Sequence, residues 1–66
     1  MSSRIGSILA MPNQYTRYAT VKDENGRNFT VEPIEIPKDA EVGKDVAFKV
    51  ELYGGDGGLA YDIQED

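Results

Sequence analysis

Apolar and polar residues alternate along much of the chain, and almost nothing repeats at the 3.6-residue spacing of a helix. Alternation with a period of two is typical of β-strands that bury one face. It is clearest over residues 46–53, where Val46, Phe48, Val50 and Leu52 share one face and charged residues lie between them. In all, the pattern predicts five strands, over residues 5–11, 15–22, 27–32, 46–53 and 59–64.

Turn-forming residues separate the predicted strands. Pro12 and Asn13 end the first strand, because proline cannot donate to the ladder and asparagine favours turns. The DENG run at residues 23–26 predicts a tight hairpin in which Asn25 and Gly26 take positive φ angles. Residues 33–44 form the one long connection, with a helical turn expected around residues 39–42, and residues 54–58 form a glycine-rich loop.

Five short strands in one 66-residue domain, residues 1–66, fit an all-β, five-stranded Greek-key barrel of the OB type. Closure is favoured because it removes the edge strands that invite aggregation. An SH3-like barrel is the alternative. The inward positions of the predicted strands give the expected core: Ile8, Ala19, Val21, Phe29, Val31, Val46, Phe48, Val50, Leu52, Ala60 and Ile63.

Composition removes much of the chemistry that a small domain can carry. The chain has no cysteine, histidine or tryptophan. Disulfides, the usual zinc, haem and iron–sulfur ligand sets and histidine acid–base catalysis are therefore not expected. We expect no enzyme, no metal site and no cofactor. Hydrophobic residues make up 39% of the chain and charged residues 29%, which is typical of a folded globular domain.

No segment approaches the roughly 20 apolar residues that a membrane-spanning helix needs. The N-terminal residues lack the apolar stretch of a signal peptide. The sequence therefore predicts a cytoplasmic protein without a membrane partner.

The second half of the chain carries a glycine-containing turn, a V-x-F-x-V strand, a glycine loop and a closing A-x-x-I, at residues 42–50, Gly54, Gly57, Ala60 and Ile63. This series resembles the C-terminal half of a cold-shock domain. Gly6 and Ile8 are similar to the family's opening strand, and residues 23–26 are similar to its acidic turn. The resemblance implies an OB-fold barrel that binds single-stranded RNA or DNA through outward aromatic residues.

The chain departs from the two motifs that carry those aromatics in the family. In place of K-G-F/Y-G-F-I, residues 16–21 read TRYATV, with one aromatic of two and neither glycine. In place of V-F-V-H-F, residues 29–33 read FTVEP, so that Thr30 and Glu32 replace the stacking side chains. The family's first-strand tryptophan falls near Ala10. Each lost base–aromatic contact removes about 1–3 kcal/mol, so the resemblance implies weak binding with little sequence preference.

The net charge of −5 divides into two unlike halves. Residues 1–31 carry four basic and two acidic side chains, whereas residues 32–66 carry three basic and ten acidic ones. The first three strands, which form the nucleic-acid surface in the family, therefore belong to the mildly basic half. This distribution keeps nucleic-acid binding open.

The candidate nucleic-acid-binding residues combine aromatic rings with basic side chains from this half: Tyr15, Arg17, Tyr18, Lys22, Arg27 and Phe29. The tyrosines and Phe29 are candidates for stacking on bases, and the basic residues for contact with phosphates. The best register buries Phe29, whereas a slip of one residue would expose it. Aromatic and arginine side chains on a strand also serve as cross-strand packing partners.

Two functions follow. The first is a small acidic protein that binds single-stranded RNA or DNA weakly, as an RNA chaperone or a regulator of transcription or translation. The second is a barrel that has lost nucleic-acid binding and contacts a protein partner, for example as an inhibitor from a phage or mobile element. The incomplete aromatic surface and Glu32 favour the second function.

Overall fold

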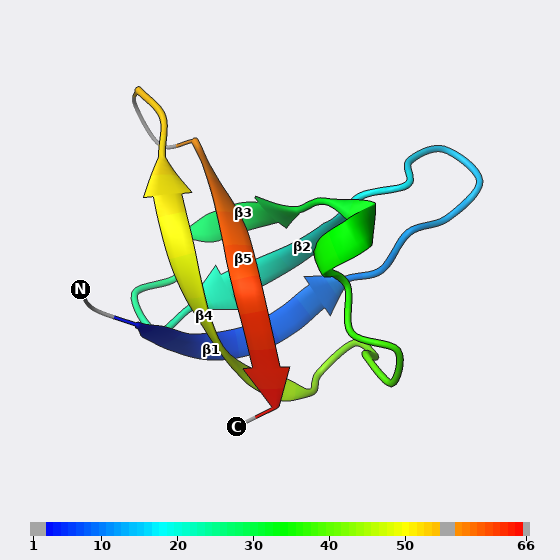
Figure 1. Ribbon diagram of the computed structural model, residues 1–66, viewed down its shortest axis with the longest axis horizontal. Helices are drawn as coiled ribbons and strands as arrows, with labels where there is room; N and C mark the ends of the chain where they lie inside the picture. Colours follow the sequence, from blue (N-terminus) through cyan, green and yellow to red (C-terminus); the bar gives the residue numbers. More distant parts are fainter. Residues whose placement is uncertain (1–2, 55–56, 66) are drawn as a thin grey trace.

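The computed structural model describes residues 3–54 and 57–65, and these contain five strands and one short 3₁₀ helix. In chain order the elements are β1 (Arg4–Ala10), β2 (Ala19–Asp23), β3 (Asn28–Val31), η1 (Pro33–Glu35), β4 (Asp45–Leu52) and β5 (Gly58–Glu65). The strands wrap around one core, and loops project from both ends of the barrel (Figure 1).

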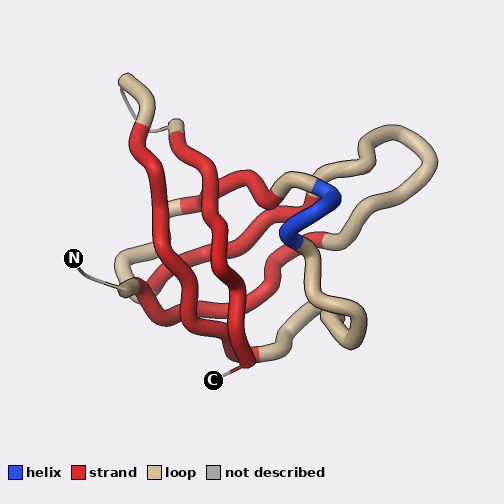
Figure 2. The backbone as a smooth tube through the Cα atoms, in the orientation of Figure 1, coloured by secondary structure: helices blue, strands red, loops and turns tan. Residues whose placement is uncertain are grey.

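The strands form a closed barrel in the order β1-β2-β3-β5-β4, and β4 returns to β1. All neighbours are antiparallel except β3 and β5, which pair in parallel at Thr30↔Leu59 and Val31↔Ala60. This short parallel seam joins the first three strands to the β4–β5 hairpin (Figure 2). The predicted five-stranded OB-type barrel is thus confirmed.

The core follows the alternation of the sequence. Among the described residues, eight hydrophobic ones are buried, and all were expected in the core: Ile8, Ala19, Val21, Phe29, Val31, Val46, Phe48 and Ala60. Val50 and Ile63 are partly buried against them. The rings of Phe29 and Phe48 meet edge to face with their centres 6.1 Å apart, a geometry that aromatic pairs prefer.

The expectation that Leu52 belongs to the core is wrong, because its residue is 52% exposed. Leu52 lies at the end of β4 and pairs with Gly58, which offers no side chain to pack against. A Cβ at Gly58 would approach the Phe29 ring to 2.9 Å. Glycine is therefore needed at that position for the close packing of β5 on Phe29, and Leu52 is left at the surface.

The second strand is shorter than the alternation predicts, because it begins at Ala19 and not at Tyr15. Residues 11–18 form a loop instead, closed by a bridge between Asn13 and Thr16. The Asn13 side chain accepts hydrogen bonds from the backbone N–H groups of Tyr15 and Thr16. Such local bonds compete with the strand ladder, which explains why the strand starts late.

The expected position of the helical turn, around residues 39–42, is wrong. The 3₁₀ helix η1 instead begins at Pro33, whose fixed φ angle suits the first position of a helix. The N–H of Ile36 closes it by donating to the carbonyl of Pro33 at 3.3 Å. The sequence signal for this helix is therefore the proline itself.

The hairpin between β2 and β3 is confirmed at residues 23–26, but its geometry differs from the prediction. Gly26 has a φ of 83°, whereas Asn25 does not adopt a positive φ. The N–H of Gly26 donates to the carbonyl of Asp23, and the N–H of Asp23 donates to the carbonyl of Arg27. This pattern is that of a longer hairpin loop in which only the last residue is left-handed.

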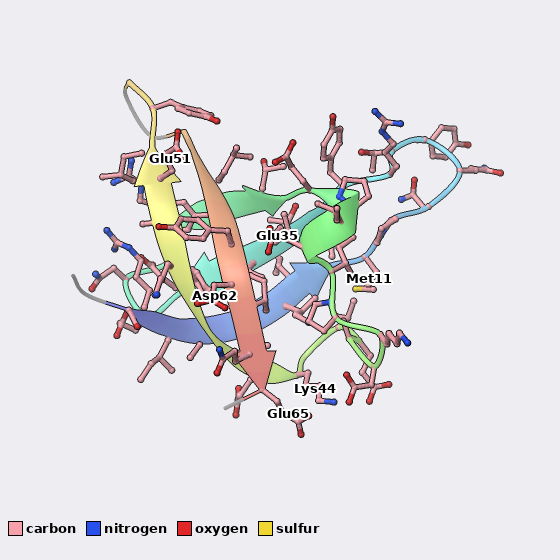
Figure 3. The ribbon with its side chains drawn as sticks, viewed as in Figure 1. Met11, Glu35, Lys44, Glu51, Asp62 and Glu65 are labelled. Atoms are coloured by element: carbon pink, nitrogen blue, oxygen red, sulfur yellow. The ribbon has the colours of Figure 1, made fainter. Side chains whose placement is uncertain are left out.

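The connection from β3 to β4 covers one end of the barrel. Met11, Ile36 and Ala40 pack against the core at this end. Lys44 then joins the connection to β5, since its Nζ lies 3.3 Å from Glu65 and 3.4 Å from Asp39. Lys44 and Glu65 meet at the lower end of β5, and Met11 lies at the side of the connection (Figure 3).

A β-bulge interrupts the regular pairing of β5 with β4 about halfway along β5. The β4–β5 register shifts between Ala47 and Lys49, and opposite this shift Asp62 takes a φ of 54°. The N–H of Asp62 donates to Glu35 Oε1 at 3.1 Å, so η1 satisfies the group that the bulge removes from the ladder. Figure 3 shows Glu35 and Asp62 at the β5 side of the barrel.

Gly6 provides a test of the packing between β1 and β2. A Cβ at this position would overlap the backbone carbonyl of Lys22. We expect Gly6→Ala to lower the free energy of unfolding by about 1–3 kcal/mol or more, because the strands must move apart. Urea denaturation measures the loss. Gly54→Ala is the control, since no atom lies within 4 Å of its added Cβ, and equal stability of the two variants would contradict this packing.

Candidate nucleic-acid interface

The structure places five of the six predicted binding residues in two separate groups. The sixth, Phe29, is buried and belongs to neither group. Tyr15, Arg17 and Tyr18 lie in the loop of residues 11–18, which projects from one end of β2 (Figure 1). Lys22 and Arg27 flank the turn at its other end. At about 3.3 Å per residue, the length of β2 places the two groups roughly 16 Å apart.

Phe29 does not belong to the interface. Its residue is 2% exposed and its side chain packs in the core, so the register that buries it is the one found. The expectation that Phe29 stacks on bases is therefore wrong. The alternation predicted its burial, because Phe29 and Val31 lie on the same side of β3.

The loop of residues 11–18, which we call the tyrosine loop, has internal hydrogen bonds that fix its shape. Asn13 Oδ1 accepts from the N–H of Tyr15 at 2.7 Å and from the N–H of Thr16 at 3.2 Å. Thr16 Oγ1 accepts from the N–H of Tyr18 at 3.2 Å. These bonds hold Tyr15 at the surface with 86% of its area exposed.

Arg17 and Tyr18 form a pair at the base of the same loop. The Arg17 guanidinium carbon lies 5.9 Å from the centre of the Tyr18 ring, within the range of a cation–π interaction. Tyr18 remains 40% exposed. The loop therefore presents two aromatic rings and one guanidinium, the side-chain types that bind single-stranded nucleic acids by stacking and charge.

The outer face of β2 and β3 lies between the two groups and is polar. Its side chains are those of two cross-strand pairs, Thr20↔Thr30 and Lys22↔Asn28. Neither strand contributes an outward aromatic ring, because the alternation directs Phe29 inward. This face can donate and accept hydrogen bonds, but it offers no stacking surface of its own.

At the far end of β2, the carboxylate of Asp23 is fully buried and has three donors. Its Oδ1 accepts from the N–H groups of Asn25 and Arg27, at 3.0 and 2.9 Å. Its Oδ2 accepts from Arg4 Nη1 at 3.0 Å, which forms an ion pair. Burial by itself would raise the pKa of Asp23, but the two backbone N–H groups and the Arg4 guanidinium outweigh it and lower that pKa below its usual value.

Two residues outside the predicted set have the same side-chain types as its members. Arg4 belongs to the basic group, because its side chain reaches Asp23 from β1. Tyr53 begins the β4–β5 loop and is 52% exposed. The β4–β5 loop of OB folds often takes part in binding. Arg4 could be found from sequence as a basic residue on the strand beside β2, whereas Tyr53 was assigned to the end of a strand.

The fold defines the chain as a small OB-type barrel. No family model, curated protein or solved structure matches the chain. Within residues 3–54 and 57–65, no helix is long and apolar enough to cross a membrane. Nor do those residues contain a cluster of carboxylates suited to holding a metal ion.

The environment of Asp23 predicts how stability depends on pH. A carboxylate whose pKa is lowered by folding stabilises the fold above its unfolded pKa, near 3.8, and this contribution disappears as the pH falls through the lower folded pKa. Asp23→Asn keeps an acceptor for the turn but loses the ion pair. We therefore expect it to cost about 1–3 kcal/mol at pH 7, with the difference from the parent shrinking below about pH 4.

Urea denaturation between pH 7 and pH 2 measures this difference. Glu24→Gln removes the neighbouring, exposed carboxylate and should change stability by less than about 0.5 kcal/mol. A loss in Asp23→Asn that is the same at every pH would show that the charge of Asp23 is not the stabilising feature.

Proposed function

We propose that the protein is a cytoplasmic binding protein for single-stranded RNA or DNA, with weak affinity and little sequence preference. Bases would stack on Tyr15 and Tyr18, and phosphates would contact Arg17, Lys22 and Arg27. The bound strand would follow the outer face of β2 and β3, the surface that OB folds commonly use together with their β1–β2 and β4–β5 loops. Such a protein would act as an RNA chaperone or a regulator of transcription or translation.

The observation that carries this proposal is the tyrosine loop. Exposed aromatic rings are costly to leave in water, and Tyr15 is held 86% exposed by the bonds of Asn13 to the backbone. A loop that is already ordered loses less conformational entropy on binding. The resemblance to cold-shock domains supports the same function, although the aromatics here lie in a loop before β2 and not on the sheet.

The same geometry supports weak binding. Two exposed tyrosines can stack on about two bases, and each stack contributes about 1–3 kcal/mol. The outer face of β2 and β3 adds hydrogen bonds and one lysine, but no ring. Little sequence preference follows, because stacking tolerates every base.

Fluorescence anisotropy with labelled oligonucleotides tests the proposal. We expect Tyr15→Ala and Tyr18→Ala each to weaken binding about 5- to 150-fold, which corresponds to a lost stack of about 1–3 kcal/mol. Arg17→Gln should reduce the slope of log affinity against log salt by about 0.7, the value for one phosphate contact on a single strand.

Tyr61→Ala is the matched control. Tyr61 belongs to β5, where it pairs with Lys49, and is not part of the tyrosine loop, so the same truncation there should leave affinity unchanged. Absence of binding at high micromolar protein and low salt would refute the proposed function, provided that circular dichroism shows the barrel to be folded.

A protein partner is the second candidate, and the outer face of β1 favours it. Ile5 is 49% exposed and Leu9 is 45% exposed on this strand. Val42 is 61% exposed, and it lies beside β1 because the N–H of Gly43 donates to the carbonyl of Ile8. Exposed apolar side chains on one face are typical of protein-binding surfaces, and Leu9 and Val42 flank the two residues joined by this hydrogen bond.

This second function predicts a complex that survives nuclease treatment in a pull-down from native lysate. We expect Leu9→Ser to lose that complex and Tyr15→Ala to retain it, because the two surfaces are separate. If every recovered partner disappears with nuclease, the protein-binding function is wrong.

A further inference from the structure

Four polar side chains form a patch on the outer face of β2 and β3, between the tyrosine loop and the β2–β3 turn. Thr20 pairs with Thr30, and Lys22 pairs with Asn28. All four point away from the core, because they alternate with buried residues along both strands. At about 3.3 Å per residue and about 4.8 Å between strands, this polar patch covers roughly 7 by 5 Å. That area corresponds to the contact surface of a single nucleotide.

The hydroxyls and the amide of the polar patch are available to a ligand. Among residues 3–54 and 57–65, no group is hydrogen-bonded to the side chains of Thr20, Thr30 or Asn28. Thr20 and Thr30 are half-buried, and Asn28 is exposed. Each hydroxyl offers one donor and two acceptor lone pairs, and the amide offers groups of both kinds. The patch can therefore donate and accept hydrogen bonds at the same place.

The charge of the polar patch is small. Lys22 carries its one positive charge, while Glu24 in the turn and Glu32 directly after β3 border the patch along the chain. Both glutamates are exposed. One lysine can hold one phosphate, but the other three side chains are neutral and a second phosphate would lie near the glutamates. These three side chains therefore suit the uncharged sugar of a nucleotide better than its phosphate.

The sugar is also the part of a strand that this face can reach. Bases stack on the rings of the tyrosine loop, whereas the polar patch has no ring on which a base could stack. A strand whose bases are held by Tyr15 and Tyr18 would thus cross the sheet with its sugars and phosphates against β2 and β3. In RNA the sugar carries a 2′-hydroxyl, which both donates and accepts hydrogen bonds and allows a protein to distinguish RNA from DNA.

We infer that the polar patch recognises the ribose 2′-hydroxyl through Thr20, Thr30 and Asn28, so that the protein prefers single-stranded RNA to DNA. This preference rests on the proposed function and deepens it, because it names the class of nucleic acid bound at the same surface. The tyrosine loop supplies affinity for either strand. The polar patch supplies the discrimination between them.

Matched oligonucleotides of about eight nucleotides, within the range that one OB barrel binds, test this preference. Anisotropy compares an unstructured uridine-rich RNA with the same sequence as DNA. Deoxyuridine replaces uridine in the DNA, so that the two strands differ only in the 2′-hydroxyl. We expect the RNA to bind roughly fivefold more tightly, the effect of one net hydrogen bond. A third strand carries 2′-fluoro groups, which keep the sugar conformation of RNA but cannot donate, and it should bind like the DNA.

Thr20→Val and Thr30→Val, made singly and together, remove the hydroxyls and keep the β-branched shape that strands favour. In the double variant we expect RNA affinity to fall roughly fivefold and DNA affinity to stay the same, which removes the preference. Ser3→Ala is the matched control. It also removes one hydroxyl, but at a surface lined by Lys49 and Gln64 of β4 and β5, and it should leave the preference unchanged. Circular dichroism checks that each variant is folded.

The outcomes separate sugar recognition from the proposed function. Equal affinity for RNA and DNA, or a preference that persists in the double variant, would overturn sugar recognition and leave the nucleic-acid function intact. A 2′-fluoro strand that binds as tightly as RNA would assign the preference to sugar conformation and overturn recognition of the hydroxyl. An equal loss of RNA and DNA affinity in the double variant would show contact with the shared backbone and overturn it as well. A folded protein that binds no strand would refute the proposed function and the RNA preference together.

Discussion

The buried carboxylate of Asp23 joins three strands at one end of the barrel. A buried charge is tolerated only when it is paired and hydrogen-bonded, and Asp23 has three donors from two sources. Two are the backbone N–H groups of Asn25 and Arg27, which define the turn between β2 and β3. The third is Arg4, which comes from the start of β1. The shape of the turn and the contact between β1 and β2 therefore both depend on the Asp23 carboxylate.

The two ends of the barrel are closed by different interactions. At the Asp23 end, the guanidiniums of Arg4 and Arg27 cover the Phe29 ring. At the other end, apolar side chains of the connection, Ile36 and Ala40 among them, cover the core. The arginines that cover the Asp23 end keep charged donors near the surface. The apolar side chains that cover the other end pack against the core.

The alternation of the sequence predicted five strands, their approximate bounds and all eight buried hydrophobic residues, because one buried face with a period of two leaves a clear signal. It failed where local hydrogen bonds override that signal. Residues 15–18 read as a strand, yet the side chain of Asn13 bonds the backbone there and forms a loop. Leu52 fits the alternation but pairs with a glycine. The contact of Arg4 with Asp23 depends on the register between β1 and β2, which pairs Gly6 with Asp23, and no local pattern contains that register.

Barrel order also determines how the acidic half of the chain affects a negatively charged ligand. Because β4 and β5 are not neighbours of β2 in the barrel, the acidic residues on these two strands, Asp45, Glu51, Asp62 and Glu65, lie away from β2, whereas Glu32 directly follows β3. The molecule measures 30 × 25 × 20 Å, and charges interact over a Debye length of about 10 Å at 0.1 M salt. Repulsion from the far side is therefore largely screened at the β2–β3 turn, while contacts of a few ångströms persist. For the proposed nucleic-acid ligand, the net charge of −5 would consequently oppose the approach more than the bound state.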